Sequence, residues 1–190
     1  MKWSLSTCIS LVLLSTGVHA QAWTPAFDSL AKITEARYAL PHGICRAFAL
    51  QESNYTPSAI RAEGNYITKN TAFAKTIRQR AVIFSKAHRY QPSILTEIVQ
   101  RGESHTMWQI MGENLRQMGL DIPFIAGNIS IADQFKYFAL FIGALLTKHG
   151  GNIAYAASEY NGGASAIRTG AFRNAGYVKN ILHNLRQFTY

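Results

Sequence analysis

Glu52 is an acidic residue that directly follows the segment AFALQ, in which only the glutamine is polar, and it is the first candidate for acid chemistry. The stretch Gly43–Ser53 is predicted to form a buried helix that stops before Pro57, because a residue preceding proline is pushed out of the helical region. Burial raises the pKa of a carboxyl group, which keeps a general acid protonated near neutral pH. The alternative is a structural glutamate that pairs with Arg46, Arg61 or solvent.

Other chemistries find less support. Cys45 is the single cysteine after residue 20, so we expect no internal disulfide, and its apolar surroundings predict a buried thiol that behaves as a small hydrophobe. A nucleophilic cysteine would need a partner histidine, and the spacing of the histidines in the sequence does not identify one. The scattered histidines and acids lack the spacing of metal ligands. We therefore expect neither a metal nor a cofactor.

Helical periodicity dominates from residue 21 onward, and strand-like alternation is nearly absent. We therefore predict an all-α chain, organised as one domain over residues 21–190. Ser130 is a plausible N-cap for the most apolar helix. The predicted helices are Phe27–Ala39, Gly43–Ser53, Thr71–His88, Ser93–Gln100, Met107–Met118, Ser130–Lys148, Ile153–Tyr160 and Gly176–Phe188.

The segment Thr71–Arg89 is basic and amphipathic, with aromatic and aliphatic residues among five Lys and Arg side chains. It could present a cationic face to a glycan or a nucleic acid. The simpler interpretation, which we favour, is a solvated basic face whose aromatic residues enter the core.

Residues 1–20 are typical of a secretory signal peptide. Lys2 precedes an apolar run, and small residues lead to a predicted cut between Ala20 and Gln21. The apolar run is interrupted and too short for a stable membrane anchor, since a span needs roughly 20 apolar residues. The net charge of +9 falls to +8 without residues 1–20, because they hold one basic residue and no acidic one. This charge favours an anionic partner, and export favours a periplasmic or secreted location.

Four segments, in this order, resemble the motifs of lytic transglycosylases of the soluble-lytic-transglycosylase type. The family patterns are E-S-x-x-x-P-x-A, S-x-G-L-M-Q-I-M, A-x-x-Y-N-x-G and a terminal Y-V-x-x-V-L. Together the motifs span about Ile44 to Leu182, which makes the set more specific than any single one. The matching segments are Glu52–Ala59 (ESNYTPSA), Ser104–Met111 (SHTMWQIM), Ala157–Gly163 (ASEYNGG) and Gly176–Leu182 (GYVKNIL).

The resemblance implies a lysozyme-like helical domain with a glycan-binding cleft. It implies cleavage of the β-1,4 bond between N-acetylmuramic acid and N-acetylglucosamine in peptidoglycan, without water, to give 1,6-anhydromuramoyl products. Glu52 would be the sole catalytic residue, first as acid and then as base. Peptidoglycan glycan strands are accordingly the expected partner, and we expect no nucleic acid.

The resemblance also assigns supporting roles to the other motif residues. Ser104, Gln109 and Asn161 would bind the hydroxyl and N-acetyl groups of the glycan, and Tyr160 and Tyr177 would line the acid. Each aromatic residue could instead be plain core packing. The chain departs from the family at Thr106, where glycine is usual, at Trp108 and at Gly112.

Two alternatives stay open. A goose-type muramidase would use water and a second acid, for which Glu103, Glu113, Asp121 and above all Glu159 are the candidates. A noncatalytic cell-wall-binding protein would keep the cleft without turnover. The sequence leaves open whether such an enzyme serves a secretion machine, a conjugation machine, wall growth or a phage-related assembly.

Overall fold

Helices make up most of the structure, as the sequence predicts. The computed structural model describes residues 22–62, 72–87, 93–121, 129–168 and 171–188, of which 68% are helical and 8% lie in strands. The predicted leader, residues 1–20, lies outside these described residues. Within them, no helix is both long and apolar enough to cross a bilayer.

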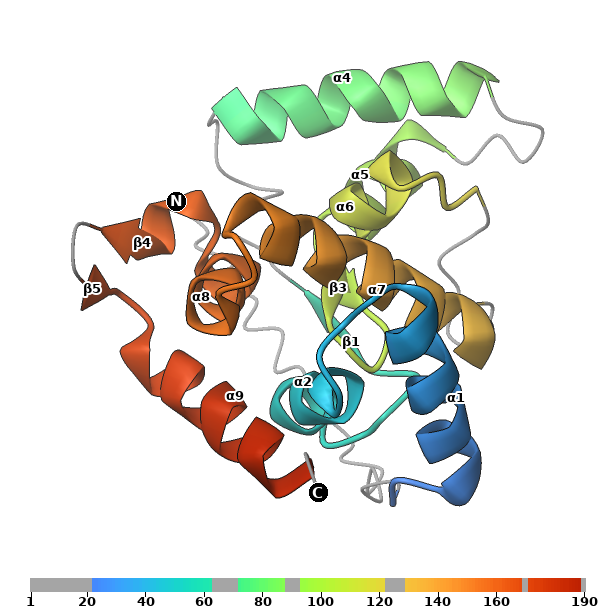
Figure 1. Ribbon diagram of the computed structural model, residues 1–190. Coiled ribbons are helices and arrows are strands. Elements are labelled where there is room, and N and C mark those ends of the chain that lie inside the picture. Colours follow the sequence, from blue (N-terminus) through green and yellow to red (C-terminus); the bar gives the residue numbers. More distant parts are fainter. Residues whose placement is uncertain (1–21, 63–71, 88–92, 122–128, 169–170, 189–190) are drawn as a thin grey trace, which may run out of the picture.

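The elements follow one another as Figure 1 labels them. Two short antiparallel sheets interrupt the helices. In chain order the elements are α1 (Pro25–Arg37), α2 (Ile44–Ser53), β1 (Ile60–Ala62), α4 (Ala72–Ala87), α5 (Ile94–Arg101), β2 (Glu103–His105), β3 (Ile110–Met111), α6 (Gly112–Gln117), α7 (Ile131–Lys148), α8 (Ile153–Gly162), the 3₁₀ turn η1 (Ala164–Ala166), β4 (Ile167–Arg168), β5 (Ala171–Phe172) and α9 (Ala175–Phe188).

Helices α1, α5, α7 and α8 begin at side-chain caps. Free backbone N–H groups in the first turn need acceptors, and a Ser or Thr hydroxyl just before the helix supplies one. The predicted cap of α7 is confirmed, because Ser130 accepts a hydrogen bond from the Asp133 amide at 3.1 Å. Thr24 caps α1 through the Phe27 amide and Ser93 caps α5 through the Thr96 amide.

Helix α2 lies in the core and packs against α1, α7 and α9. Cys45 and Phe48 are fully buried in it, so the expectation of a buried thiol at Cys45 is confirmed. Burial, with the nearby Glu35 carboxylate, raises the pKa of the Cys45 thiol well above its ordinary value. A thiol in this state is inert.

The predicted helix Met107–Met118 is wrong in its first half. Residues 107–109 form turns, Ile110–Met111 form β3, and only Gly112–Gln117 are helical. β3 pairs antiparallel with β2, which pairs with β1. The apolar spacing of this stretch reflects burial of Met107, Trp108 and Ile110 from a non-helical backbone. Tertiary packing therefore overrides the helical pattern.

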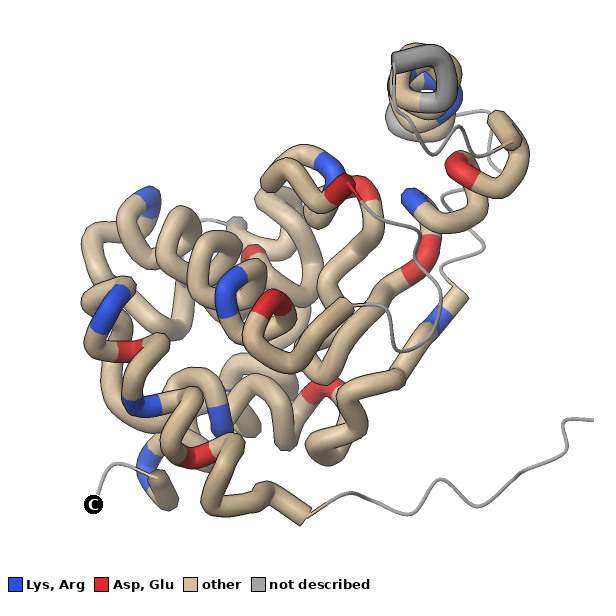
Figure 2. The backbone as a smooth tube through the Cα atoms, turned by 90° about the vertical axis from the view of Figure 1, so that its right-hand side faces the viewer, with Lys and Arg blue, Asp and Glu red and all other residues tan. Residues whose placement is uncertain are grey.

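Helix α4 stands at the edge of the molecule, seen end-on in Figure 2, and packs against α5. Phe84 and Ile77 are buried, whereas Lys75, Arg78 and the apolar Ile83 are exposed. The simpler interpretation of the basic segment is thereby favoured for its described residues, 72–87.

A buried network of charges joins α4, α5 and α6. Glu97 is fully buried and accepts two hydrogen bonds from the Arg116 guanidinium, both at 2.9 Å. Glu113, also buried, accepts from Arg101 at 2.6 Å and from Arg80 at 2.5 Å. Buried charges are costly unless paired and hydrogen-bonded, so this network fixes how the three helices meet.

Gly112 is required where α6 passes α5. A Cβ at this position would lie 2.0 Å from the Gln100 carbonyl oxygen, and that carbonyl also interacts with the buried His105 ring nitrogen at 3.0 Å. A close backbone contact thus explains the glycine at position 112, where the chain departs from the motif that it resembles.

We predict that Gly112→Ala lowers the free energy of unfolding by about 1–3 kcal/mol, because the backbone must shift to admit the methyl group. Gly143→Ala is the matched control: its Cβ would meet nothing closer than Leu40 Cδ2 at 3.7 Å, and helix propensity there should add about 0.5–1 kcal/mol. Urea unfolding followed by circular dichroism measures both. Equal stability of the two variants would contradict the prediction.

Candidate active site

The Glu52 carboxyl group lies at the end of α2 and contacts α9. Glu52 is half-buried, and the Tyr177 hydroxyl donates a hydrogen bond to its Oε1 at 2.5 Å, across 125 positions of sequence. Tyr177 can reach it because α2 and α9 pack side by side. The expectation that Tyr177 lies beside the acid is confirmed.

The Tyr177 phenol is held in its protonated form. Burial raises its pKa well above the ordinary value, and the negative charge of Glu52 raises it further. A phenol that stays protonated remains a hydrogen-bond donor at every physiological pH. Tyr177 therefore fixes one carboxyl oxygen of Glu52.

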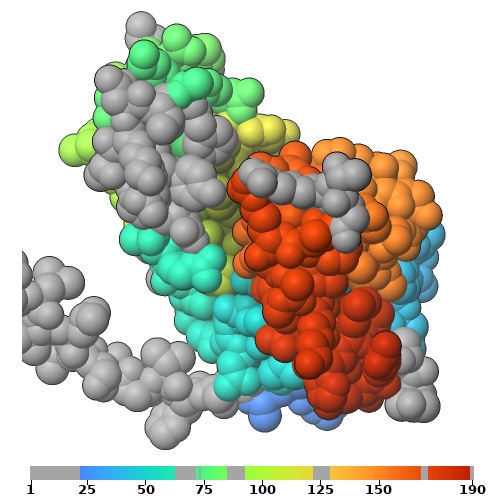
Figure 3. Space-filling model, turned by 90° about the vertical axis from the view of Figure 1, so that its left-hand side faces the viewer, coloured from blue at the N-terminus to red at the C-terminus, as the bar shows by residue number. Residues whose placement is uncertain are grey.

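A pocket of about 370 Å³ opens beside Glu52, within the size range of ligand sites. Figure 3 shows the surface hollowed between the cyan side, around residues 50–60, and the orange-red side formed by α8 and α9. The lining combines two carboxyl groups and one guanidinium group with amide, hydroxyl and apolar groups. It consists of Glu52, Arg61, Ser104, Gln109, Ile110, Met111, Asn114, Phe141, Leu145, Glu159, Tyr160, Asn161 and Gly163.

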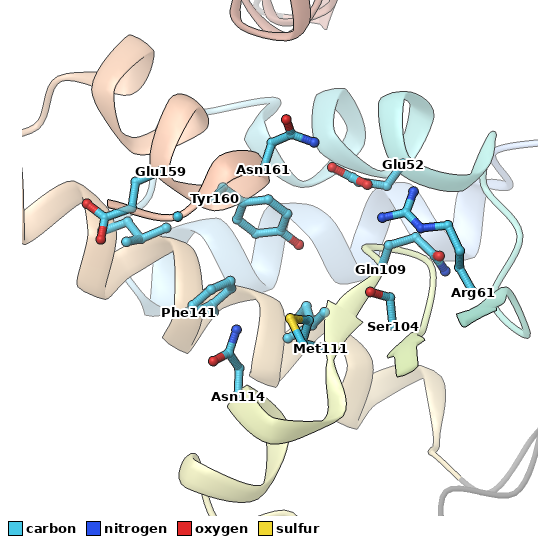
Figure 4. A pocket seen from close by; sticks show the side chains of 13 residues that line it. Glu52, Arg61, Ser104, Gln109, Met111, Asn114, Phe141, Glu159, Tyr160 and Asn161 are labelled. Atoms are coloured by element: carbon cyan, nitrogen blue, oxygen red, sulfur yellow. The ribbon is translucent and has the colours of Figure 1, made fainter. Parts of the chain in front are cut away.

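Four of the predicted site residues line this pocket together with Glu52. Ser104, Gln109, Tyr160 and Asn161 come from β2, the β2–β3 connection and α8, and Figure 4 shows them around one space. Tyr177 is not part of the lining and reaches the Glu52 carboxyl group from α9.

Gln109 is tied to the protein by its amide nitrogen. Nε2 donates to the carbonyl oxygens of Ala59 and Thr106, each at 3.0 Å. These bonds fasten the entry of β1 to the β2–β3 connection. The amide oxygen is therefore the Gln109 atom suited to accept a hydrogen bond from a ligand.

Tyr160 serves both the core and the pocket. Its hydroxyl donates to the Trp108 carbonyl oxygen at 2.6 Å, and its ring packs against Phe48 and Phe141 with centroids 5.0 and 5.1 Å away. Burial raises the pKa of the Tyr160 phenol well above its ordinary value. Its ring lines the pocket, while its hydroxyl is used within the protein.

Asn161 is oriented by a neighbour that the sequence did not single out, Asn174. The Asn174 amide nitrogen donates to Asn161 Oδ1 and to the Ser158 carbonyl oxygen, both at 3.0 Å. With its oxygen engaged, Asn161 presents its amide nitrogen on the Glu52 side of the pocket, as Figure 4 shows.

Arg61 lines the pocket but was not predicted as a site residue. The sequence suggested it only as a structural partner of Glu52. It lies on β1, directly opposite Ser104 on β2. Residues directly opposite in an antiparallel pair share one face of the sheet, which brings both side chains to the pocket. Arg61 reaches the pocket only because β1 pairs with β2, and the local sequence around Arg61 does not predict that pairing.

Among the lining residues, Glu159 is the single acid besides Glu52. Lys148 Nζ contacts its two carboxylate oxygens at 2.6 and 2.8 Å, and His149 Nε2 contacts one of them at 2.8 Å. Figure 4 shows its carboxylate turned away from Glu52. The other three candidate acids, Glu103, Glu113 and Asp121, are not among the lining residues.

Within the described ranges, no group of three or more His, Cys, Asp or Glu side chains could hold a metal ion. The pocket itself offers the Glu52 and Glu159 carboxyl groups and the Arg61 guanidinium group among amide and hydroxyl groups. No protein-family model, curated protein or solved structure matches the chain.

The Glu159 ion pairs predict a stability change in acid. Partial burial raises the pKa of Glu159, but the hydrogen bonds and charges of Lys148 and His149 outweigh it and hold this pKa below the ordinary 4.5. Because the folded-state pKa is depressed, the stabilisation is present above about pH 4.5 and is lost as the pH falls below it. We expect Glu159→Gln to remove this loss, at most about 1 kcal/mol, since Lys148 is half-exposed.

Thermal unfolding between pH 7 and pH 3 measures the effect. Glu103→Gln is the control, because burial raises the pKa of Glu103 and gives it the opposite linkage. That variant should keep the acid-side loss attributed to Glu159. An unchanged pH profile in Glu159→Gln would show that the ion pairs contribute nothing measurable.

Proposed function

We propose that the protein is a peptidoglycan lytic transglycosylase in which Glu52 is the single catalytic acid and base. The observation that carries the proposal is the Glu52–Tyr177 hydrogen bond at the edge of a polar pocket. All five other residues expected from the motif resemblance either line this pocket or contact Glu52. Motifs that lie far apart in the sequence thus converge on one carboxyl group.

We further propose a lysozyme-like domain whose glycan-binding cleft includes this pocket. The pocket wall offers the groups that N-acetylated sugars need: a hydroxyl from Ser104, an amide oxygen from Gln109 and an amide nitrogen from Asn161. The Tyr160 ring adds an apolar surface for a sugar face.

In the first step Glu52 donates its proton to the glycosidic oxygen between N-acetylmuramic acid and N-acetylglucosamine. The bond from that oxygen to the muramoyl C1 breaks, and the N-acetylglucosamine side leaves with a new hydroxyl group. Positive charge develops at C1 and the ring oxygen. The 2-acetamido group of the substrate can stabilise this charge in place of a second protein carboxylate.

In the second step the Glu52 carboxylate removes the proton of the muramoyl C6 hydroxyl while that oxygen bonds to C1. A 1,6-anhydro ring forms, Glu52 regains its proton, and no water is consumed. Tyr177 holds one carboxyl oxygen through both steps, so the same Glu52 oxygen can release and recapture the proton.

A muramidase is the second candidate, and the position of Glu159 speaks against it. A hydrolase of the usual type needs a second carboxylate to act as nucleophile or to activate water. Glu159 is engaged by Lys148 and His149 and turned away from Glu52. A wall-binding protein without turnover has no use for the Glu52–Tyr177 pair.

The location proposed for this activity is the periplasm or the medium, after cleavage of the leader behind Ala20. Peptidoglycan carries peptide carboxylates, and the positive net charge favours attraction to that polymer. We propose local wall opening for a secretion, conjugation or phage-related assembly as the biological role. Activity on whole sacculi equal to that of a housekeeping enzyme, without any partner, would contradict this role.

Glu52→Gln should abolish cleavage of purified sacculi, with product release lowered by at least about a hundredfold, because the amide cannot donate or accept the proton. Mass spectrometry should find wild-type muropeptides one water lighter than hydrolysis products. Glu159→Gln is the matched control and should keep this activity. Reducing-end products that disappear with Glu159→Gln would instead establish a muramidase.

Tyr177→Phe should lower kcat about tenfold and leave KM nearly unchanged, because the ring still packs but one hydrogen bond to the catalytic group is lost. Tyr155→Phe serves as the control, since that tyrosine is 37% exposed and packs against Phe172 rather than Glu52. Initial rates on soluble glycan strands measure both. A Tyr177→Phe variant with full kcat but reduced thermal stability would indicate a purely structural tyrosine.

A further inference from the structure

Arg61 brings a positive charge into the Glu52 pocket. It is the middle residue of β1, whose three residues are all exposed, and it lies opposite the buried Ser104. Figure 4 shows its guanidinium group turned toward the Glu52 carboxyl group, from the opposite side to Glu159. The cation therefore lies where a ligand that reaches Glu52 would pass.

This cation works against the first step of the proposed reaction. A positive charge near a carboxyl group favours its ionised form, whereas a general acid must hold its proton. The Arg61 charge already acts on this pair, because it lowers the pKa of Tyr177 against the larger upward effects of burial and Glu52. A role in keeping Glu52 protonated is thus excluded for Arg61 by the sign of its charge.

The other charged residues that line the pocket are consistent with a role for Arg61 in binding a ligand. The second lining acid, Glu159, is engaged by Lys148 and His149 at the far end. Among the described lining residues Arg61 is the single Lys or Arg. A guanidinium group binds carboxylates through two parallel hydrogen bonds, which gives both affinity and orientation.

We infer that Arg61 binds a carboxylate of the substrate, one carried by the peptide stems of the glycan strand. This inference rests on the proposed function and narrows its substrate class to carboxylate-bearing muramoyl strands. A docked carboxylate would also neutralise the Arg61 charge at Glu52. The acid would then be protonated most readily when an anionic strand is bound, which couples recognition to the first proton transfer.

Equilibrium binding tests the inference without requiring turnover. All proteins carry Glu52→Gln so that strands stay intact, and they are compared with and without Arg61→Gln, Arg61→Lys or Lys75→Gln. The last is a matched control that removes one exposed positive charge from α4. The probes are soluble glycan strands with free stem carboxylates and the same strands after conversion of those carboxylates to amides.

The Glu52→Gln protein should bind the free-carboxylate strands about tenfold more tightly than the amidated strands. Arg61→Gln should abolish that preference, Arg61→Lys should restore part of it, and Lys75→Gln should retain it. The preference should shrink at high salt, as expected for a partly exposed ion pair. A preference that survives Arg61→Gln, or equal loss of binding to both strand types, would overturn the inference.

These binding data, taken together with mass spectrometry of the products of the wild-type protein, separate this inference from the proposed function. If the wild-type protein releases no anhydromuramoyl products while the Arg61-dependent preference persists, the proposed reaction fails and the carboxylate subsite stands. If anhydromuramoyl products form but no preference depends on Arg61, the reaction stands and the subsite is refuted. Failure of the Glu52→Gln protein to bind either strand type also refutes the subsite.

Discussion

The fully buried side chain of Trp108 is the contact on which the geometry of the site depends. Its indole Nε1 donates to the Cys45 carbonyl oxygen of α2 at 2.9 Å, and its ring stacks on Phe138 of α7 at 4.8 Å. Its own carbonyl oxygen accepts the Tyr160 hydroxyl of α8 at 2.6 Å. One residue between β2 and β3 thus fixes the distances among three helices, including the helix that carries Glu52.

Holding Trp108 in this position requires an unusual backbone on either side of it. Thr106 and Gln109 adopt φ angles of 76° and 50°, in the left-handed region that costs a non-glycine residue about 1–3 kcal/mol. The motif resemblance places glycine at Thr106, and the chain keeps a conformation suited to glycine there. Burial of the indole ring and the Gln109 amide bonds offset this cost. The strained turn directs Gln109 into the pocket.

The sequence predicted the elements whose signals are local and missed those set by distant contacts. A serine cap and an apolar run suffice for the helix that starts after Ser130, and its bounds are confirmed. The range Met107–Met118 has the same apolar spacing, yet pairing with β2 and burial of Trp108 turn its first half into turns and a strand. Likewise, only the motif resemblance predicted that Glu52 and Tyr177 lie close together, because 125 positions of sequence separate them. No local pattern in the sequence predicted that Arg61 lines the pocket.

Two kinds of packing hold the residues of the pocket in place: an uncharged aromatic core and a buried network of ion pairs. Glu52 and the Tyr160 ring project from helices held by the aromatic core, where uncharged contacts set distances. Asn114 projects from α6, which the buried Glu97 and Glu113 networks hold to α5. Such a network is stable only while all its charges are paired, so it locks that wall into one arrangement. The aromatic core thus positions the Glu52 carboxyl group, the charge network positions the α6 side of the pocket, and Trp108 links the two.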